Sequence, residues 1–166
     1  QRGAGARAVR LAAAIAAFRK SVQLWRTLGR ETRDVATGLN DLANAERISH
    51  NLDAAERHYR QALRIARAVD YGEGVAYITG NLALLELERD NWVAAEPIAR
   101  EALSLSEQLG RQDLIALHCD FLAEALLEQG KKAEALPYAQ RAVDIFARLG
   151  SRDLKAVRQT LAECES

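Results

Sequence analysis

Three histidines and one thiol are the side chains whose chemistry could support a metal site or catalysis: His50, His58, His118 and Cys119. Helical metal sites commonly carry two ligands one turn apart, as in a His-Glu-x-x-His segment, and the chain contains no such segment. His50 and His58 are eight positions apart, with an expected turn between them. The spacing favours solvated or packed histidines, and we predict no metal site.

Cys119 follows His118 directly, which raises the alternative of a thiol activated by a neighbouring base. Adjacent residues of a helix do not face each other, so the imidazole is not expected to reach the thiol. No serine, histidine and acid combination can be recognised either. Cys119 and Cys164 both lie in helical patterns, and we predict buried free thiols in a reducing cytoplasm.

The only glycine-rich stretch is RGAGAR (2–7). It lacks the Gly-Lys-Ser/Thr ending of a phosphate loop, and no strand precedes it. We therefore predict no nucleotide or other cofactor.

The composition excludes further classes of function. Lysine plus arginine equals aspartate plus glutamate, 23 each, whereas nucleic-acid binders usually carry a basic face. No apolar run approaches the ~18 residues of a membrane helix. Hydrophobic residues make up 49% of the chain, which argues against disorder. The absence of methionine suggests a fragment of a longer protein. We expect a cytoplasmic protein that binds neither nucleic acid nor membrane.

The segments that position these side chains repeat along the chain. NLDAAERHYRQALRIARAVD (51–70), NWVAAEPIAREALSLSEQLG (91–110) and KKAEALPYAQRAVDIFARLG (131–150) superimpose at a spacing of 40 residues, and the segments before them match too. The only two prolines, Pro97 and Pro137, occupy the same place in two of these segments. Near the start of a helix a proline removes few amide hydrogen bonds. The matched prolines therefore indicate one repeated helical unit.

Each repeat is predicted to contain two helices, because apolar residues recur at helical spacing and no strand-like alternation occurs. Segments such as QGKK and LGSRD mark the turns. We predict Asp34, Asp113 and Asp153 as N-caps, and Gly110 and Gly150 as left-handed residues that end helices. The fold class is all-α.

The repeats predict a single domain over residues 1–166 with about eight helices. Its parts are a half repeat (6–29), three repeats (34–70, 74–110 and 114–150) and a C-terminal capping helix (153–164). The last helix is more polar, as a terminal helix of a repeat array needs to be, and a truncated further repeat is the alternative.

The repeated motif resembles the tetratricopeptide repeat, in which a leucine and a small residue of the first helix precede alanine, aromatic and alanine positions of the second. The first full repeat supplies Leu42, Ala43, Ala55, Tyr59 and Ala62. The unit has 40 residues rather than about 34, which is similar to kinesin light chains and to repeat arrays of bacterial regulators and signalling NTPases. The resemblance implies a right-handed α-solenoid of antiparallel helix pairs, with the first helices lining a concave groove.

The resemblance places a peptide-binding groove on the first helices, one turn from each Leu–Ala pair. The candidate residues are Thr37, Asn40, Asn44, Arg47, Tyr77, Asn81, Leu84, Glu88, Leu117, Asp120, Glu124 and Glu128. Asparagine amides both donate and accept hydrogen bonds, which suits recognition of an extended peptide. The charges predict a ligand of mixed or partly basic character. The alternative is an ordinary solvated helix face.

These features predict a non-enzymatic protein-interaction scaffold that binds a peptide or a partner helix. The alternative is a ligand- or partner-sensing repeat segment of a larger bacterial transcriptional regulator or signalling ATPase. A catalytic domain is the least supported class, because no convergent reactive set is found. The half repeat has no preceding first helix, so we expect its face around Phe18, Val22 and Trp25 to be partly uncovered and to form homo-oligomer contacts.

Overall fold

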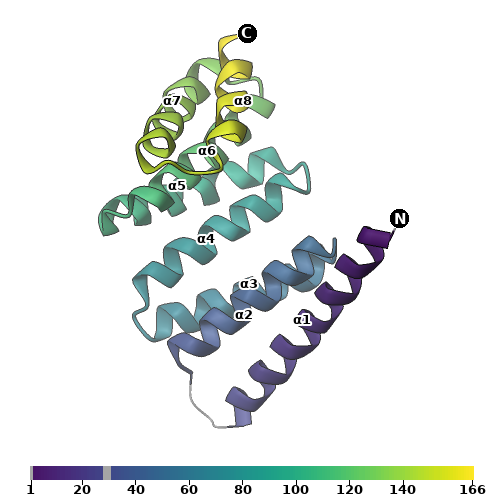
Figure 1. Ribbon diagram of the computed structural model, residues 1–166. Helices are drawn as coiled ribbons and strands as arrows, with labels where there is room; N and C mark the ends of the chain where they lie inside the picture. Colours follow the sequence, from purple (N-terminus) through teal and green to yellow (C-terminus); the bar gives the residue numbers. More distant parts are fainter. Residues whose placement is uncertain (1, 28–30) are drawn as a thin grey trace. The chain divides into compact units, whose positions relative to one another are not determined.

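The computed structural model describes residues 2–27 and 31–166, and all regular secondary structure in these ranges is helical (Figure 1). The helices are α1 (Arg2–Thr27), α2 (Arg33–Ile48), α3 (Leu52–Ala68), α4 (Gly72–Leu87), α5 (Trp92–Leu109), α6 (Gln112–Glu128), α7 (Lys132–Leu149) and α8 (Leu154–Glu165). The predicted all-α class is confirmed. The last two residues of the predicted half repeat, 28–29, lie outside the described residues. Among the described helices, none is both long and apolar enough to cross a membrane.

The chain forms two compact units whose boundary falls inside α4. Unit 1 comprises Gln1–Ile78 and unit 2 comprises Thr79–Ser166. In unit 1, α2 packs against both α1 and α3, and in unit 2, α6 packs against α5, α7 and α8. The central helix of each unit is a first helix of a predicted repeat, so it contacts a second helix on either side.

Helix α2 covers much of the apolar face of α1 in unit 1. Val22 is 5% exposed, and Phe18 and Trp25 are partly buried. The Trp25 ring lies where a β-carbon of Gly38 would be, 2.2 Å from its Cζ3 atom. Our expectation of a partly uncovered face is therefore wrong for Val22, whereas Phe18 and Trp25 keep some exposed surface. The reason is that α1 turns these residues toward α2, and it exposes Val9 and Leu24 instead.

A buried carboxylate ties the helices of unit 1 together. Glu46 of α2 is fully buried, and its two oxygens contact different helices. Oε1 accepts a hydrogen bond from Arg19 Nη2 of α1 at 2.8 Å, and Oε2 lies 2.6 Å from His58 Nδ1 of α3. Burial of a charge costs several kcal/mol unless partners compensate it, so these two contacts are needed for the carboxylate to be buried.

Small residues in fixed columns let the helices of unit 2 approach closely. The second helices α5 and α7 bury an alanine at each equivalent place. These fully buried alanines are Ala95, Ala99 and Ala102 in α5, and Ala135, Ala139 and Ala142 in α7. All of these alanines except Ala102 pack with Leu122, Leu126 and Phe146 in one core cluster. The repeat of 40 residues thus corresponds to a repeat in packing.

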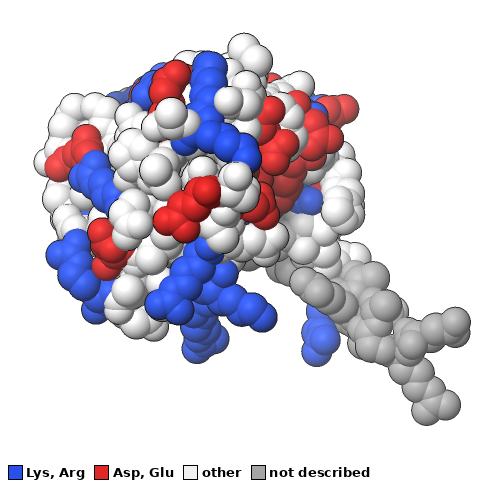
Figure 2. Space-filling model, turned by 90° about the horizontal axis from the view of Figure 1, so that it is seen from above, with Lys and Arg blue, Asp and Glu red and all other residues white. Residues whose placement is uncertain are grey.

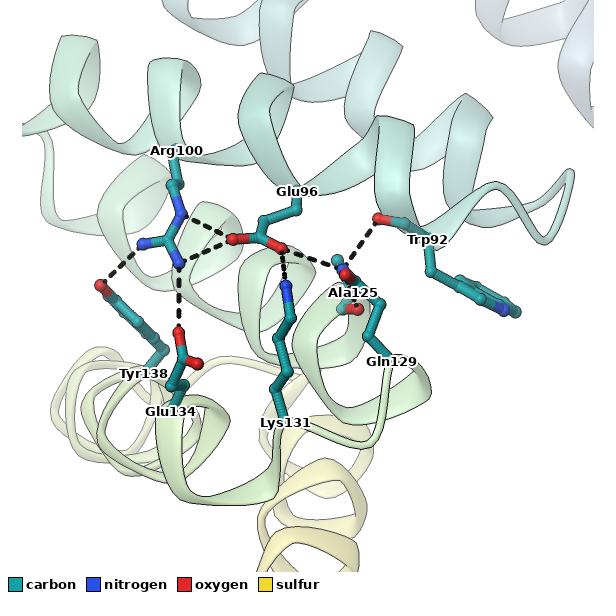
Figure 3. Close-up of polar contacts among 8 residues, drawn as sticks. All are labelled: Trp92, Glu96, Arg100, Ala125, Gln129, Lys131, Glu134 and Tyr138. Atoms are coloured by element: carbon teal, nitrogen blue, oxygen red, sulfur yellow. Dashed lines mark hydrogen bonds and ion pairs between the residues drawn. The ribbon is translucent and has the colours of Figure 1, made fainter.

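Glu96 of α5 connects three segments of unit 2 (Figure 3). Its carboxylate accepts hydrogen bonds from Arg100 of the same helix, from Gln129 at the end of α6 and from Lys131 before α7, at 2.8 to 3.0 Å. These bonds lower the pKa of Glu96 to about 2, with the Lys131 bond as the largest cause. Arg100 also lies over the Tyr138 ring and donates to its hydroxyl. This network joins α5 to α7 across the turn that follows α6.

Turns recur every 20 residues with the same backbone conformation. The residue with positive φ in each turn is His50, Asp70, Asp90, Gly110, Gly130 and Gly150, with φ between 50° and 74°. The left-handed conformation at the end of a helix satisfies its last carbonyls, and glycine adopts it without steric cost. Gly110 and Gly150 end α5 and α7, as predicted.

Two of the three predicted N-caps are wrong. Thr32 rather than Asp34 caps α2, with its hydroxyl accepting from Val35 N, and Arg111 rather than Asp113 occupies the cap of α6. Asp34 and Asp113 lie in the first turns, where a carboxylate still interacts favourably with the helix dipole. Asp153 is at the cap of α8, where its side chain does not bond the helix amides and instead accepts a hydrogen bond from the Ser151 hydroxyl at 3.2 Å. The presence of an acidic residue near a helix start therefore does not predict whether that residue is the N-cap or lies in the first turn.

Candidate functional site

The outward faces of the first helices carry the candidate groove residues. We define the outer stripe as three repeated positions on α2, α4 and α6, spaced seven and four residues apart so that they share one helix face. Its members are Thr37, Asn44 and Ile48 on α2, Tyr77 and Leu84 on α4 with Glu88 directly after that helix, and Leu117, Glu124 and Glu128 on α6. Every member is exposed or partly buried. A partner could therefore reach this stripe without unfolding either unit.

The predicted asparagines are less accessible than the rest of the set. Asn40 and Asn81 are only 4% and 6% exposed. Asn44 is partly buried, and its Oδ1 accepts a 2.7 Å hydrogen bond from the Tyr59 hydroxyl of α3. The Tyr59 ring is itself fully buried. These amides serve packing within their units, and the assignment of a peptide-reading role to them remains a prediction.

Of the other predicted residues outside the acidic ones, two are exposed and three are partly buried. Thr37 is exposed and donates to the Arg33 carbonyl, and Tyr77 is 42% exposed. Arg47 is partly buried. Leu84 and Leu117 are partly buried and pack against the core of unit 2 while keeping some exposed surface. The outer stripe thus offers apolar and polar contacts in both units.

Ile48 belongs to the outer stripe although the sequence analysis did not select it. It is 47% exposed at the end of α2, and the equivalent residues one and two repeats later are Glu88 and Glu128. The 40-residue spacing could have identified it, because Glu88 and Glu128 were candidates and Ile48 occupies the same position one repeat earlier. The isoleucine adds an apolar contact to the stripe in unit 1.

Carboxylates gather around Glu124 in unit 2. Its pKa is raised to about 7 by burial first, and then by repulsion from Asp120, Glu128, Glu163 and Glu88. Burial also raises the pKa of Asp120 to about 6, against a stabilising hydrogen bond from Thr160. These groups come from α6, from α8 and from the turn after α4, which no motif of the sequence connects. Their mutual repulsion favours either a bound proton or a bound cationic group.

Ser106 and His118 form a hydrogen-bonded pair that a catalytic site would require, at 2.8 Å between Oγ and Nδ1. The Ser106 hydroxyl also contacts the Ala102 carbonyl at 2.8 Å, and that carbonyl can only accept its proton. His118 Nδ1 must then donate to Ser106, so the imidazole does not act as a base toward this hydroxyl. Both side chains are fully buried, and burial lowers the pKa of His118 to about 4. The pair is a packing element that substrate cannot reach.

The thiols are free and buried, as predicted. Burial raises the pKa of Cys119 to about 11, so the thiol stays protonated and weakly nucleophilic at neutral pH. His50 is exposed in a turn, and His58 contacts Glu46. Within residues 2–27 and 31–166, no three histidine, cysteine or acidic side chains are arranged to hold a metal ion.

Solved structures of helical repeat proteins share this fold. The crystal structure of BtubC (BKLC) from P. vanneervenii has a TM-score of 0.77 and 24% sequence identity, over 93% of this chain and 65% of that chain. The apo form of RapI has a TM-score of 0.82 and 18% identity, over 96% of this chain and 44% of that chain. The chain thus spans less than two thirds of these two proteins.

The crystal structure of a putative kinesin light chain from Podosopora anserina, with nearly identical TPR-like repeats, is also similar. Its TM-score is 0.75, with 16% identity over 95% of this chain and 79% of that chain. The TM-scores show that these proteins share the fold of the chain, and at identities below 25% the comparison shows the fold alone. No curated protein sequence matches the chain.

A tetratricopeptide repeat family model matches residues 6–68 and 74–164, which is most of the chain. The match includes the leucine–alanine pairs of the first helices and the buried alanine columns of the second helices. The chain belongs to the tetratricopeptide repeat family.

Proposed function

We propose that this protein is a non-enzymatic scaffold whose outer stripe binds a peptide or a helix of a partner protein. Membership of the tetratricopeptide repeat family supports a protein-interaction scaffold in general terms. The observation that carries the finer proposal is the exposure of the outer stripe. Tyr77 and Ile48, at 42% and 47% exposed, are apolar or aromatic side chains that unit 1 does not bury.

Apolar anchors and polar groups alternate along this stripe as peptide-binding helix faces require. An extended or helical peptide places side chains into apolar contacts and satisfies its polar groups at the rim. Tyr77 of α4 offers both a ring and a hydroxyl, and Thr37 occupies the equivalent position of α2, one repeat earlier. Aromatic residues of this kind often contribute a large part of binding energy.

Pull-down with the whole chain as bait tests the proposal. We expect a Thr37→Ala/Tyr77→Ala/Ile48→Ser variant to lose the partner that wild type recovers. The matched control is Val93→Ser, because Val93 is 76% exposed but lies on the second helix α5. Recovery of the same partner by the stripe variant, at the wild-type level, would reject the stripe as the binding face. Equal circular dichroism spectra would verify that all variants are folded.

The alternative function is a sensing segment within a larger bacterial regulator or signalling ATPase. What supports it is the 40-residue repeat, which resembles the repeat arrays of bacterial regulators and signalling NTPases. The test is the coding sequence on either side of this segment. A helix-turn-helix or phosphate-loop module encoded in the same reading frame would support the alternative. A reading frame limited to further repeats would favour the scaffold.

Self-association through α1 is a separate proposal. Val9 and Leu24 of α1 are 71% and 61% exposed, and a second copy could cover them. Light scattering over a concentration series tests this contact, with Val9→Ser/Leu24→Ser as the variant. A strict monomer at the highest concentration would reject it.

A further inference from the structure

The outer stripe of unit 2 differs from that of unit 1 in its charge. We define the acidic stripe as Glu88 in the turn after α4, Asp120, Glu124 and Glu128 of α6, and Glu163 of α8, which are Glu124 and the carboxylates that raise its pKa. Carboxylates lie side by side in a dense patch on the face seen in Figure 2. Two leucines of the outer stripe precede these residues in the sequence, Leu84 on α4 and Leu117 on α6.

The central carboxylates of the acidic stripe have no cationic partner within the described part of the chain. Neither Glu124 nor Glu128 forms a hydrogen bond or an ion pair there, whereas Glu96, the carboxylate at the centre of Figure 3, has three donors. Repulsion between these carboxylates, which raises the pKa of Glu124, destabilises the folded chain. A bound cationic group would compensate this repulsion, which gives the unpartnered carboxylates a direct explanation.

The charge of the whole unit acts in the same direction. Unit 2 contains 15 aspartates and glutamates against 10 lysines and arginines, while unit 1 contains 8 against 13. The chain is neutral only because these two excesses, −5 and +5, cancel. A net negative unit attracts basic partners and accelerates their association, and it repels nucleic acid.

Apolar contacts lie on the same helix faces as the carboxylates. Leu84 precedes Glu88 by one helical turn, and Leu117 precedes Asp120 by one turn and Glu124 by two. Both leucines are partly exposed, and both pack against the buried core, which holds their side chains in place. An occupant of this surface therefore needs apolar side chains as well as positive charge, which a hydrated metal ion does not have.

We propose that the acidic stripe binds a basic amphipathic segment of a partner protein, with lysines or arginines on its carboxylates and apolar side chains on Leu84 and Leu117. This inference rests on the proposed function and specifies the partner. Arginine pairs with carboxylates through two parallel hydrogen bonds, so a segment with arginines one turn apart would follow the spacing of Asp120 and Glu124. Apolar residues between the charges supply the contacts that hold the segment in register.

Fluorescence anisotropy with labelled synthetic peptides tests this inference on the whole chain. The probes are a peptide of alternating leucine and arginine pairs, the same peptide with glutamine for arginine, and the same peptide with glutamate for arginine. We expect the arginine peptide to bind, and to bind about tenfold or more weakly when Glu88, Glu124 and Glu128 are changed to glutamine. The glutamine and glutamate peptides should bind much more weakly to wild type.

A matched control removes the same number of carboxylates from unit 2 outside the acidic stripe. The control variant is Glu101→Gln/Asp144→Asn/Glu165→Gln, in which none of the changed groups contributes to the pKa of Glu124. If the control variant weakens binding of the arginine peptide as much as the acidic-stripe variant does, the effect is one of net charge, and the proposed site is overturned. Replacement of Glu124 and Glu128 by glutamine relieves their repulsion, and urea denaturation verifies that the acidic-stripe and control variants are folded.

The pH gives a second measurement. Because a bound guanidinium favours the ionised form of Glu124, affinity for the arginine peptide should rise between pH 6 and 8 with the pKa of about 7. The carboxylates that repel this group are Glu88 of the turn after α4, Asp120 and Glu128 of α6, and Glu163 of α8. A pH-independent affinity over this range would contradict the role of Glu124.

Two outcomes separate this inference from the proposed function. The first outcome is that the Thr37→Ala/Tyr77→Ala/Ile48→Ser variant loses its partner in the pull-down while the arginine peptide fails to bind wild type. The scaffold function then stands, and the basic partner is rejected. If the chain instead self-associates at low salt and the acidic-stripe variant abolishes this, the basic excess of unit 1 in a second copy is the occupant. That result would overturn the assignment to a partner protein.

Discussion

The Nε2 atom of His118 lies directly against the α-carbon of Gly80, so that a β-carbon added at Gly80 would come within 2.1 Å of it. His118 is fully buried on α6, and Gly80 lies on α4. The imidazole occupies the space that any larger residue at position 80 would need. Since Ser106 holds the other ring nitrogen at 2.8 Å, the ring cannot move away without losing that bond.

Gly80→Ala should destabilise the protein by about 1–3 kcal/mol, because overpacking must shift a ring that is held in place. Alanine favours a helix over glycine by about 1 kcal/mol, and this gain is expected to be outweighed. Urea denaturation measures the difference. Gly5→Ala on α1 is the control, since a β-carbon there meets nothing within 4 Å and should stabilise slightly. Stabilisation by Gly80→Ala would show that the ring rearranges freely.

Removal of both partners of Glu46 should unfold unit 1 more readily than any single surface change. The Arg19→Ala/His58→Ala variant leaves a fully buried carboxylate uncompensated, and we expect a loss of about 3 kcal/mol in the free energy of unfolding. Adding Glu46→Ala to that variant should recover part of the loss. The control, Arg60→Ala, breaks the exposed pair with Glu56 and should change stability by less than about 1 kcal/mol. No recovery in the triple variant would argue against an electrostatic cause.

Glycine at the non-glycine turn positions should stabilise the fold. Asp90 has φ of 58°, and the equivalent residue one repeat later is Gly130. A left-handed residue other than glycine costs about 1–2 kcal/mol, of which the greater freedom of glycine in the unfolded chain cancels part. We expect Asp90→Gly to raise the free energy of unfolding by about 0.5–1 kcal/mol, as measured by urea denaturation. The reverse change, Gly130→Ala, should lower it.

The raised pKa of Glu124 predicts a pH-dependent cost. A carboxyl with a folded-state pKa of about 7 and an ordinary value of 4.5 binds more protons in the folded state, so stability falls as pH rises through this interval. Glu124→Gln should remove the part of the fall that Glu124 causes, whereas the fall from the raised pKa of Asp120 occurs in both proteins. The advantage of the variant over wild type should grow from pH 4.5 to 7 and then remain constant. Urea denaturation at several pH values measures this difference.

His118 has the opposite effect on the pH dependence of wild type. Its pKa is lowered from 6.5 to about 4, so the unfolded state binds more protons and stability is lost as pH falls between these values. For this reason the test compares wild type with Glu124→Gln at each pH, and the His118 contribution cancels. An advantage of the variant that does not change with pH would contradict the assignment.

Much of the fold could be predicted because a helix is specified by residues close in sequence. The 40-residue spacing of the alanine columns, the matched prolines, and the glycines that end α5 and α7 all reflect local backbone and side-chain requirements. Pro97 and Pro137 are each the sixth residue of their helix and are exposed, which agrees with their expected place near a helix start. The N-caps failed because neighbouring polar residues can serve at a helix start equally well.

The candidate site was only partly predictable, because accessibility depends on which residue of a neighbouring helix lies opposite. Asn44 and Thr37 lie on the same expected face, yet Tyr59 of α3 binds the Asn44 amide and leaves Thr37 exposed. The Ser106–His118 contact joins residues of two helices that no sequence motif links.

The sequence by itself determined the helices, their repeat and the family, since periodicity and turn residues act within about 20 residues of one another. Only the tertiary structure decided which polar groups are compensated. Glu46 lies 27 positions from Arg19 and acquires two partners, whereas Glu124 is repelled by carboxylates of α6, of α8 and of the turn after α4. Charge interactions depend on distance in space, and that distance is set by the packing of whole helices.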